Sequence, residues 1–296
     1  MNYSAEYKSK LCTAAEAVSL VKSGDWVDYS SNNAFPQSLD AALAQRRDEL
    51  FGVKVRGNLL PGPIAVVECD AEGAHFTYNT WHCSAYERRL CDRGRAFFTP
   101  MLFRNMAWYY KNFLKVDVAM VSAAPMDRHG YFNLSGALGV SKAIIDRADT
   151  VIIEVNEAMP RIRGGQDEVV HISQVDRIVE AGYRPLWEMK SPPPTETDMK
   201  IAQFVFPHIR DGATVQLGIG GMPNALGGLI AESGLKDLGM HTELCSDGYL
   251  QMFKAGKLTN RRKSRARGCL ALPLAQGSCT NGWMRIRGLR AFPSAM

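Results

Sequence analysis

Three consecutive pieces of sequence decide the fold: VDVAMVSAA at residues 116–124, SKAIIDRAD at 141–149 and TVIIEV at 150–155. The first and last are short apolar runs, which predict strands, and the piece between them has a helical pattern. A strand, a helix and a strand at this spacing form a βαβ unit with parallel pairing. We therefore predict an α/β fold with mainly parallel sheets.

Polar clusters follow the predicted strands. They are PMDRHGYFN at 125–133, EVNEAMP at 154–160 and HTELCSDG at 241–248. In open parallel sheets, ligands bind at the carboxyl ends of the strands. The functional residues are therefore expected in these three clusters.

A weak internal repeat predicts two related halves. GDWVDYSSNNAFPQSLDAAL from Gly24 and GATVQLGIGGMPNALGGLI from Gly212 both show a glycine turn, a short strand, a loop of small residues, a proline and a helix. The apolar residues at helical spacing are Leu39 and Leu43 in the first half and Leu226 and Ile230 in the second. Between the halves, KSPPPTETD at 190–198 ends whatever precedes it, because it holds three consecutive prolines. The architecture expected is two tandem related α/β domains, the second one incomplete.

Composition and charge argue against a secreted, a membrane or a nucleic-acid-binding protein. The chain has 296 residues and 46% hydrophobic content, enough for about two domains. It shows no signal-peptide pattern and no run of about 18 apolar residues, so we expect a soluble cytoplasmic protein without a membrane partner. The net charge is +5, but eight Lys and Arg and no acidic residue lie from Arg261 onward, so residues 1–260 carry −3. RRKSRARG at 261–268 has the charge to bind nucleic acid, although a solvated run is more common, and no nucleic-acid partner is expected.

The seven cysteines have no CxxC pair and no clustered Cys/His spacing. They are therefore expected to be reduced and mostly structural, and no metal site is predicted.

The glycine-rich stretch LGIGGMPNALGGL at 217–229 follows an apolar run and leads into a predicted helix. Gly218 and Gly220 fit a dinucleotide fingerprint, but Pro223 stands where the third glycine belongs, and no Walker lysine is present. The N–H groups of Ile219, Gly220 and Gly221 are still free to hold an anion at a helix start. A tight turn without a ligand remains the plain alternative.

Glu243 stands downstream in LGMHTELCSDG, where Met240 to Cys245 has the alternation of a strand and Asp247 to Gly248 turns the chain into a helix. A glutamate in an apolar strand is costly to bury without a partner, so a paired or solvent-facing side chain is the ordinary interpretation. A carboxylate nucleophile near backbone N–H donors would instead serve acyl transfer through a covalent intermediate.

The chain resembles the family I coenzyme A transferases. The resemblance rests on LGIGGMPNALGGLIAESGLKDLGMHTELCSDGYLQMFKAGKLTN at 217–260, and on HFTYNTWHCSAYERRLCDRG, VDVAMVSAAPMDRHGYFN, VIIEVNEAMPR and VHISQVDRIVE before it. Within the family, part of the acetyl-CoA hydrolase/transferase superfamily, it points to the butyryl-CoA:acetate and 4-hydroxybutyrate branch.

The resemblance implies that Glu243 is the nucleophile and carries a glutamyl-CoA thioester while CoA passes from an acyl-CoA to a carboxylate such as acetate. It implies CoA as a substrate, no metal or other cofactor, and a homo-oligomer. Candidates to hold the thioester oxygen or the CoA chain are Gly218, Gly220, Gly221 and Asn224. Hydrolysis of the acyl-CoA and a catalytically disabled remnant remain as alternatives.

The first half offers candidates for an acyl or carboxylate pocket, each with a structural alternative. These are Asn32, Asn33, His129, Glu154 and Asn156. Asn32 and Asn33 could equally form a plain turn, and His129 could be hydrogen-bonded within its own loop. Trp81 and His82 resemble a pocket element of the family, while aromatic packing explains them as well.

The last residues depart from the family. Gly277 to Met296, back-translated with chosen synonymous codons and read from the third base, give KLYEWMDENPRITGFPIGN, which resembles the family better than the printed tail. We therefore expect a frameshift near Gly268. The predicted organisation is an N-terminal CoA-transferase-like domain at 1–190, a proline-rich linker at 191–198, a partial catalytic domain at 199–268 and an out-of-frame tail at 269–296.

Overall fold

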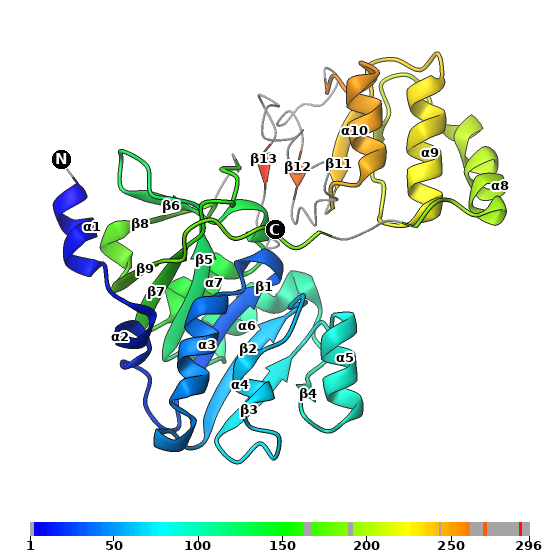
Figure 1. Cartoon of the computed structure of the whole chain (residues 1–296). Helices are drawn as coiled ribbons and strands as arrows, with labels where there is room; N and C mark the ends of the chain where they lie inside the picture. The colour runs from blue at the N-terminus through cyan, green and yellow to red at the C-terminus, as the bar shows by residue number, and fades with distance from the viewer. Residues whose placement is uncertain are drawn as a thin grey trace. The chain divides into compact units, whose positions relative to one another are not determined.

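The computed structural model describes residues 3–162, 167–188, 192–242, 244–260, 269–270 and 290–291. These residues divide into two compact units. The first unit includes residues 3–159 and 169–187, and the second includes the remaining described residues. Figure 1 gives the element labels used below.

A seven-stranded sheet forms the centre of the first unit, with the order β4-β3-β2-β1-β5-β7-β9 and every neighbouring pair parallel. Its strands are β1 (Trp26–Ser31), β2 (Val53–Asn58), β3 (Phe76–Thr80), β4 (Phe97–Phe98), β5 (Val118–Ala123), β7 (Thr150–Val155) and β9 (Arg177–Glu180). The predicted βαβ unit is confirmed, because β5 pairs in parallel with β7, from Val118 opposite Thr150 to Ala123 opposite Val155. The predicted α/β class with a large parallel sheet is therefore correct.

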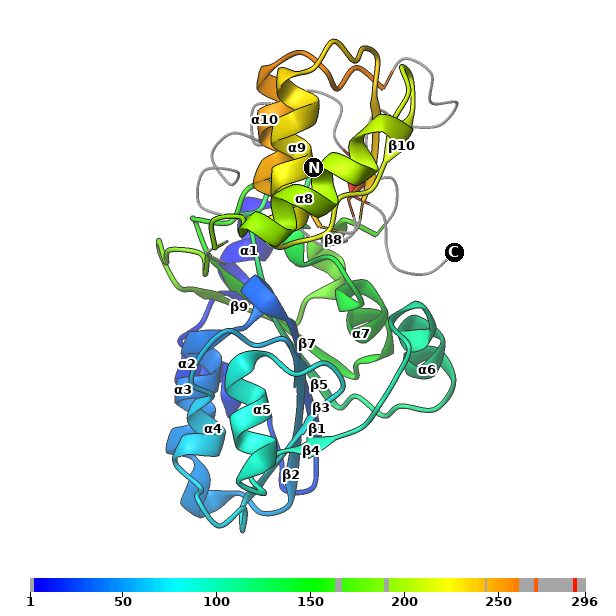
Figure 2. The ribbon, with the colours of Figure 1, turned by 90° about the vertical axis from the view of Figure 1, so that its right-hand side faces the viewer.

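Helices cover both faces of this sheet (Figure 2). On one face lie α2 (Ala14–Val18), α3 (Gln37–Gln45), α4 (Ala65–Glu68) and α5 (Ala85–Asp92), and on the other α6 (Met106–Asn112) and α7 (Ser141–Arg147). Helix α1 (Ser4–Lys10) and an antiparallel pair of β6 (Tyr131–Asn133) with β8 (Val169–His171) complete the unit. Short 3-10 helices are η1 (Asn32–Ala34), η2 (Arg47–Glu49), η3 (Phe103–Asn105), η4 (Ser135–Ala137) and η5 (Ile172–Gln174).

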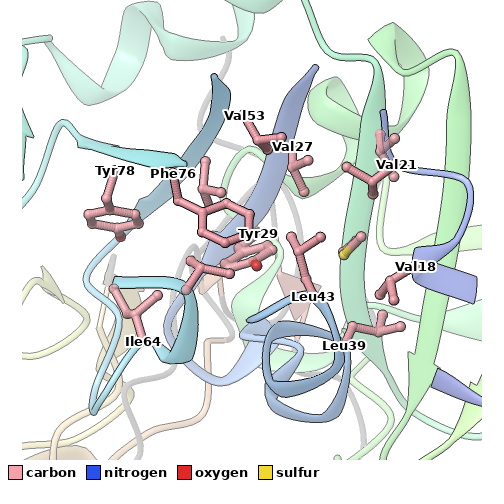
Figure 3. Close-up of a cluster of buried hydrophobic side chains, with 14 of the residues drawn as sticks. Val18, Val21, Val27, Tyr29, Leu39, Leu43, Val53, Ile64, Phe76 and Tyr78 are labelled. Atoms are coloured by element: carbon pink, nitrogen blue, oxygen red, sulfur yellow. The ribbon is translucent and has the colours of Figure 1, made fainter. Parts of the chain in front are cut away.

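The main core of the first unit lies between α3 and the strands (Figure 3). Leu39 and Leu43, predicted on one face of a helix, are both fully buried. They lie in one cluster with Val27 of β1 and Ile64. Burying each such side chain contributes roughly 1.5–3 kcal/mol, which fixes α3 at the end of β1.

The second unit repeats the strand-loop-helix pattern on a smaller scale. Its elements are α8 (Glu196–Val205), η6 (Phe206–His208), β10 (Thr214–Val215), α9 (Gly221–Glu232), β11 (Gly239–Thr242), α10 (Asp247–Lys254), β12 (Cys269–Leu270) and β13 (Arg290–Ala291). The strands form a parallel sheet in the order β10-β11-β12-β13. Leu226 and Ile230 of α9 are buried in this unit's core, as their spacing predicts.

Candidate functional site

The glycine-rich loop between β10 and α9 is fixed at its first residue. The backbone N–H of Leu217 donates to the Tyr249 hydroxyl oxygen at 2.6 Å, and the Thr242 hydroxyl donates to the Leu217 carbonyl at 3.3 Å. Tyr249 lies in α10 and also donates to the carbonyl of Val215 at 3.0 Å. Since Thr242 is the last residue of β11, the loop is tied to both elements that flank position 243.

Beyond Leu217, the loop presents consecutive open donors. The N–H groups of Gly218, Ile219, Gly220 and Gly221 have no hydrogen-bond partner within the described residues. Gly220 has φ +124° and ψ 178°, a conformation open essentially to glycine alone, and it leads directly into α9. Free N–H groups at the positive end of a helix are suited to binding an anion.

A carboxylate absent from the sequence prediction lies at the start of α9. Asp198 accepts a hydrogen bond from the N–H of Met222, and a Cβ placed on Gly221 would lie 2.5 Å from its Oδ2. The backbone N–H and hydroxyl of Thr195 both donate to Oδ2 at 2.8 Å. These hydrogen bonds lower the pKa of Asp198 and hold its charge beside Gly221.

Asn224 connects α9 to α10. Its Oδ1 accepts a hydrogen bond from the N–H of Gly248 at 3.2 Å. The two helices are very close here, since a Cβ on Gly227 would lie 2.5 Å from the Cα of Gly248. This bond gives Asn224 a structural role that the sequence prediction missed, and its predicted role in CoA binding stays a prediction.

Glu243 lies outside the described residues. The alternation predicts a strand to Cys245, whereas β11 comprises Gly239–Thr242 and the Thr242 hydroxyl donates to the Leu244 carbonyl at 2.8 Å. Thr242 and Cys245 are both buried. The predicted helix start is confirmed, since α10 begins at Asp247.

In the first unit, Glu154 near the end of β7 holds the start of α3. Its side chain is fully buried. Its Oε2 accepts from the N–H groups of Ser38 at 2.8 Å and Leu39 at 3.1 Å. Its Oε1 accepts from the Ser122 hydroxyl at 3.0 Å and forms an ion pair with Arg184. The carboxylate thus neutralises both the helix N-terminus and a guanidinium.

The segment from Arg184 to Trp187 brings three predicted residues together. Asn33 accepts from the Trp187 N–H at 2.8 Å and donates to the Trp187 carbonyl at 3.2 Å. Asn156 accepts from the Arg184 N–H at 3.0 Å, and Glu154 pairs with the Arg184 side chain. Sequence reasoning missed Arg184, because it stands in no motif and meets its partners only through tertiary structure.

Asn32 differs from these residues, since its side-chain amide is buried and its N–H₂ group donates no hydrogen bond within the described structure. The residue is 4% exposed, and its Nδ2 has no hydrogen-bond partner in the described structure. A buried unpaired donor costs about 1–3 kcal/mol, so it calls for a functional explanation.

Residues with positive φ cluster at the carboxyl ends of β1 and β2. Ser30 and Asn32 at the end of β1 have φ +59° and +48°, and Leu59 after β2 has φ +51°. Ser135, with φ +56°, begins η4, which contacts η1. Positive φ is uncommon for residues with a side chain and is often maintained at functional sites.

His129 and Trp81 have contacts that their structural alternatives describe, and their roles in a site stay predictions. His129 is exposed, and its Nε2 accepts from the Arg128 Nε at 3.0 Å within one turn. Trp81 is buried and packs edge-on against Tyr110, with ring centroids 5.8 Å apart. The indole Nε1 of Trp81 has no partner within the described structure.

Neither a metal-binding cluster nor a membrane-spanning helix is found in the part of the chain that the structure describes. Within the described ranges, no group of three or more His, Cys, Asp or Glu side chains is placed to hold a metal ion. No helix in the same ranges is both long and apolar enough to span a membrane.

The chain has close relatives among the CoA-transferases. The butyryl-CoA:acetate CoA-transferase of Anaerostipes caccae is 44% identical over 266 residues, which are 89% of this chain and 60% of that protein. The probable butyrate:acetyl-CoA coenzyme A-transferase of Syntrophomonas wolfei is 44% identical over 260 residues, or 88% of this chain and 58% of that protein. The chain thus spans about 60% of the length of these relatives.

A solved structure shares the fold over nearly the whole chain. The crystal structure of RipA from Yersinia pestis matches with a TM-score of 0.90 and 28% identity, covering 99% of this chain and 70% of RipA. The model of the acetyl-CoA hydrolase/transferase N-terminal domain matches residues 1–185, more than half of the sequence. The chain therefore belongs to the acetyl-CoA hydrolase/transferase family.

Proposed function

We propose that the protein transfers CoA from butyryl-CoA, or a similar short-chain acyl-CoA, to a carboxylate such as acetate. The observation that carries the proposal is the 44% identity to a butyryl-CoA:acetate CoA-transferase across 89% of the chain. The open N–H groups at the start of α9 support it, because acyl transfer needs donors for a developing oxyanion. Coenzyme A is then a substrate.

The proposed nucleophile is Glu243. Its carboxylate attacks the thioester carbonyl and expels CoA thiolate, which leaves an acyl-glutamyl anhydride. The thiolate attacks the glutamyl carbonyl, releases the first carboxylate and leaves a glutamyl-CoA thioester. The acceptor carboxylate attacks that thioester and expels the thiolate, which finally attacks the acceptor's carbonyl and regenerates Glu243.

The loop donors supply the electrostatic part of this proposal. The N–H groups of Gly220 and Gly221 would hold the oxyanion, and Gly218 and Asn224 would contact the CoA chain. Removing one such donor typically lowers kcat by roughly 10²–10³. The charge of Asp198 beside Gly221 would oppose a full anion there and favour a partly charged oxygen.

The first unit would bind the acyl group or the acceptor carboxylate. Asn32 would donate from its unpartnered Nδ2. Glu154, Asn156 and Asn33 would act as positioning residues, because their hydrogen bonds hold α3 and the 184–187 segment. His129, in the turn at 125–133, would serve as a further partner for the carboxylate.

The domain organisation remains part of the proposal. We infer an N-terminal domain to residue 190, a linker at 191–198, part of a catalytic domain at 199–268 and an out-of-frame tail from 269. The active species would be a homo-oligomer. The tail lies outside the described residues except at 269–270 and 290–291.

The intact mass of the purified chain after incubation with butyryl-CoA tests the nucleophile. The expected product gains one CoA less one water in the parent chain and nothing in Glu243→Ala or Glu243→Gln. An adduct that persists in both variants would reject Glu243, and a folded parent without any adduct would reject transferase activity for this chain.

Hydrolysis is a second candidate, because the matching family model covers hydrolases as well as transferases. A time course of free CoA with and without acetate separates the two reactions. Release of CoA that needs no acceptor, with no acetate-dependent formation of acetyl-CoA from butyryl-CoA, would identify a hydrolase.

A further inference from the structure

Two thiols stand close together beside the carboxyl end of β3. The Sγ atoms of Cys83 and Cys91 are 3.9 Å apart, and both residues are half-buried. Cys83 lies three residues after β3 and just before Ser84, the N-cap of α5, and Cys91 lies in the last turn of α5. The pair is therefore a dithiol set between the edge of the sheet and a helix.

Cys12 and Cys69 have no recorded contact with another thiol among the described side chains. Cys12 and Cys69 are half-buried like the pair, and the Cys69 thiol donates to the Val66 carbonyl at 3.5 Å. Cys245 is buried. Among the described thiols, only Cys83 and Cys91 are recorded in contact with each other, which makes the half-buried Cys12 a matched control.

We infer that Cys83 and Cys91 form a site of reversible oxidation, closed to a disulfide by a small-molecule disulfide such as glutathione disulfide. One thiolate attacks a sulfur of the oxidant and expels the first thiol, which leaves a mixed disulfide. The second thiolate attacks the protein sulfur of that mixed disulfide and expels the second thiol. The protein loses two electrons and two protons, and one oxidant disulfide becomes two thiols.

The surroundings allow the sulfur atoms to meet. A disulfide needs an S–S distance of about 2.05 Å, so the pair must approach by roughly 1.9 Å. Cys83 lies outside α5 in irregular backbone, where a small rotation can supply this movement. The helix start stays anchored meanwhile, because Ser84 and Glu87 form a reciprocal capping box.

A disulfide between Cys83 and Cys91 would be linked to the turn after β2 by backbone hydrogen bonds of the residues next to Cys83. The His82 carbonyl, next to Cys83, accepts from the N–H of Leu59 at 2.7 Å. The Cys83 carbonyl accepts from an Arg88 Nη at 3.0 Å. Oxidation would therefore restrain the turns that follow β2 and β3, where Leu59 has positive φ.

The ionisation of Cys83 sets the expected rate. Burial, together with the neighbouring Cys91 thiol, raises the pKa of Cys83 to about 12. Since the thiolate is the reacting form, oxidation should be slow near neutral pH and accelerate as the pH rises. The same high pKa makes Cys83 a poor leaving group, so the bond should resist reduction once formed.

Peptide mapping of the folded full chain tests the site. Trypsin cleaves after Arg88 and Arg89, so a Cys83–Cys91 bond joins the peptide 57–88 to the peptide 90–93. Because the first peptide also contains Cys69, the parent for the test is Cys69→Ser. After incubation with glutathione disulfide at pH 8.5 and blocking of free thiols, we expect the joined pair, and its disappearance after reduction.

Two single variants complete the design. In the same background, Cys83→Ser and Cys91→Ser should each abolish the joined peptides, while Cys12→Ser should leave them unchanged; circular dichroism verifies that each variant is folded. Blocked thiols at both positions, a lasting mixed disulfide at either, or a bond to a different cysteine would overturn the inference.

Discussion

The starts of α3 and α9 occupy matching places in the two strand-loop-helix patterns, but their N-terminal N–H groups have different acceptors. At α3, the fully buried carboxylate of Glu154 accepts two backbone N–H groups and is itself paired with Arg184. At α9, the half-buried Asp198 accepts from only one N–H group of the helix, that of Met222, and the N–H groups of Gly218 to Gly221 remain open within the described residues. The first helix start is sealed by the protein's own carboxylate, and the second leaves these N–H groups without an acceptor in the part of the chain that the structure describes.

Of the substitutions considered, removal of Glu154 from the start of α3 should lower the unfolding free energy most. Glu154→Ala leaves two backbone N–H groups and the half-buried Arg184 guanidinium without their partner, so we expect a loss of about 3 kcal/mol in unfolding free energy. Glu154→Gln keeps the shape and one acceptor oxygen and should lose less. Urea unfolding at pH 7 measures both.

Tryptophan fluorescence reports mainly on the first unit, because four of the five tryptophans lie in it: Trp26, Trp81, Trp108 and Trp187. Glu157→Ala is the matched control, since this neighbouring side chain is exposed. Equal losses in Glu154→Ala and the control would show that Glu154 does not seal α3.

Carboxylates of the two regions should also respond to pH in opposite directions. Burial raises the pKa of Asp40, in α3, to about 6, although the N–H groups of Ala65 and Val66 donate to it. Its folded pKa exceeds its unfolded value of 3.8, so the folded protein holds an extra proton between these values. The unfolding free energy should therefore fall as the pH rises from 4 to 6, by on the order of 2 kcal/mol for this group.

The variant Asp40→Asn should flatten that part of the pH profile in urea unfolding. The slope will not vanish, because burial also raises the pKa of Asp28 to about 6. The pKa of Asp198 is lowered instead, so its contribution is lost only as the pH falls below about 4. Asp198→Asn should leave the slope between pH 4 and 6 unchanged, and a steeper slope in Asp40→Asn would contradict the assignment.

The open helix start depends on backbone that only glycine adopts. Gly220→Ala forces a side chain into φ +124°, at a cost of about 1–3 kcal/mol, and should move the donors and abolish the CoA adduct. Gly234→Ala is the control, because it lies outside the proposed site, has no positive φ and its Cβ would meet no heavy atom within 4 Å. Thermal unfolding and intact mass compare the two variants, and equal behaviour would remove Gly220 from the site.

The local sequence pattern predicts the helices and strands, but it does not predict the hydrogen-bond partners of the polar side chains. The βαβ unit from 116 to 155 and the helices carrying Leu39 and Leu226 follow from the spacing of apolar residues, which the sequence displays directly. Strand β11 is shorter than its alternation predicts, and the Thr242 hydroxyl donates to the carbonyl two residues ahead.

The partners of the polar residues depend on contacts between distant segments. Arg184 lies 30 residues from Glu154, and Asp198 lies more than 20 from Gly221, with no motif linking either pair. Asn33 and Asn224 were identified as site residues, but the chain alone could not show that backbone groups of Trp187 and Gly248 engage their amides.

The smallest expected effect on stability concerns Asn32, the unsatisfied donor at the end of β1. Asn32→Gly keeps the tolerance for positive φ and removes the Nδ2 donor without adding a charge. Because loss of a buried unpaired donor offsets part of the loss of packing, the unfolding free energy at pH 7 should change by less than about 1 kcal/mol. If this amide receives the acceptor carboxylate, the KM for acetate should instead rise about tenfold or more, since a hydrogen bond to a charged group is worth about 1.5–3 kcal/mol. Asn33→Gly gives the opposite expectation, a loss of stability with little change in KM, because its amide is already bonded to the backbone of Trp187. An unchanged KM in Asn32→Gly, in a preparation that still forms the CoA adduct, would leave the buried amide without a role in binding the acceptor and would separate that failure from a failure of transfer itself.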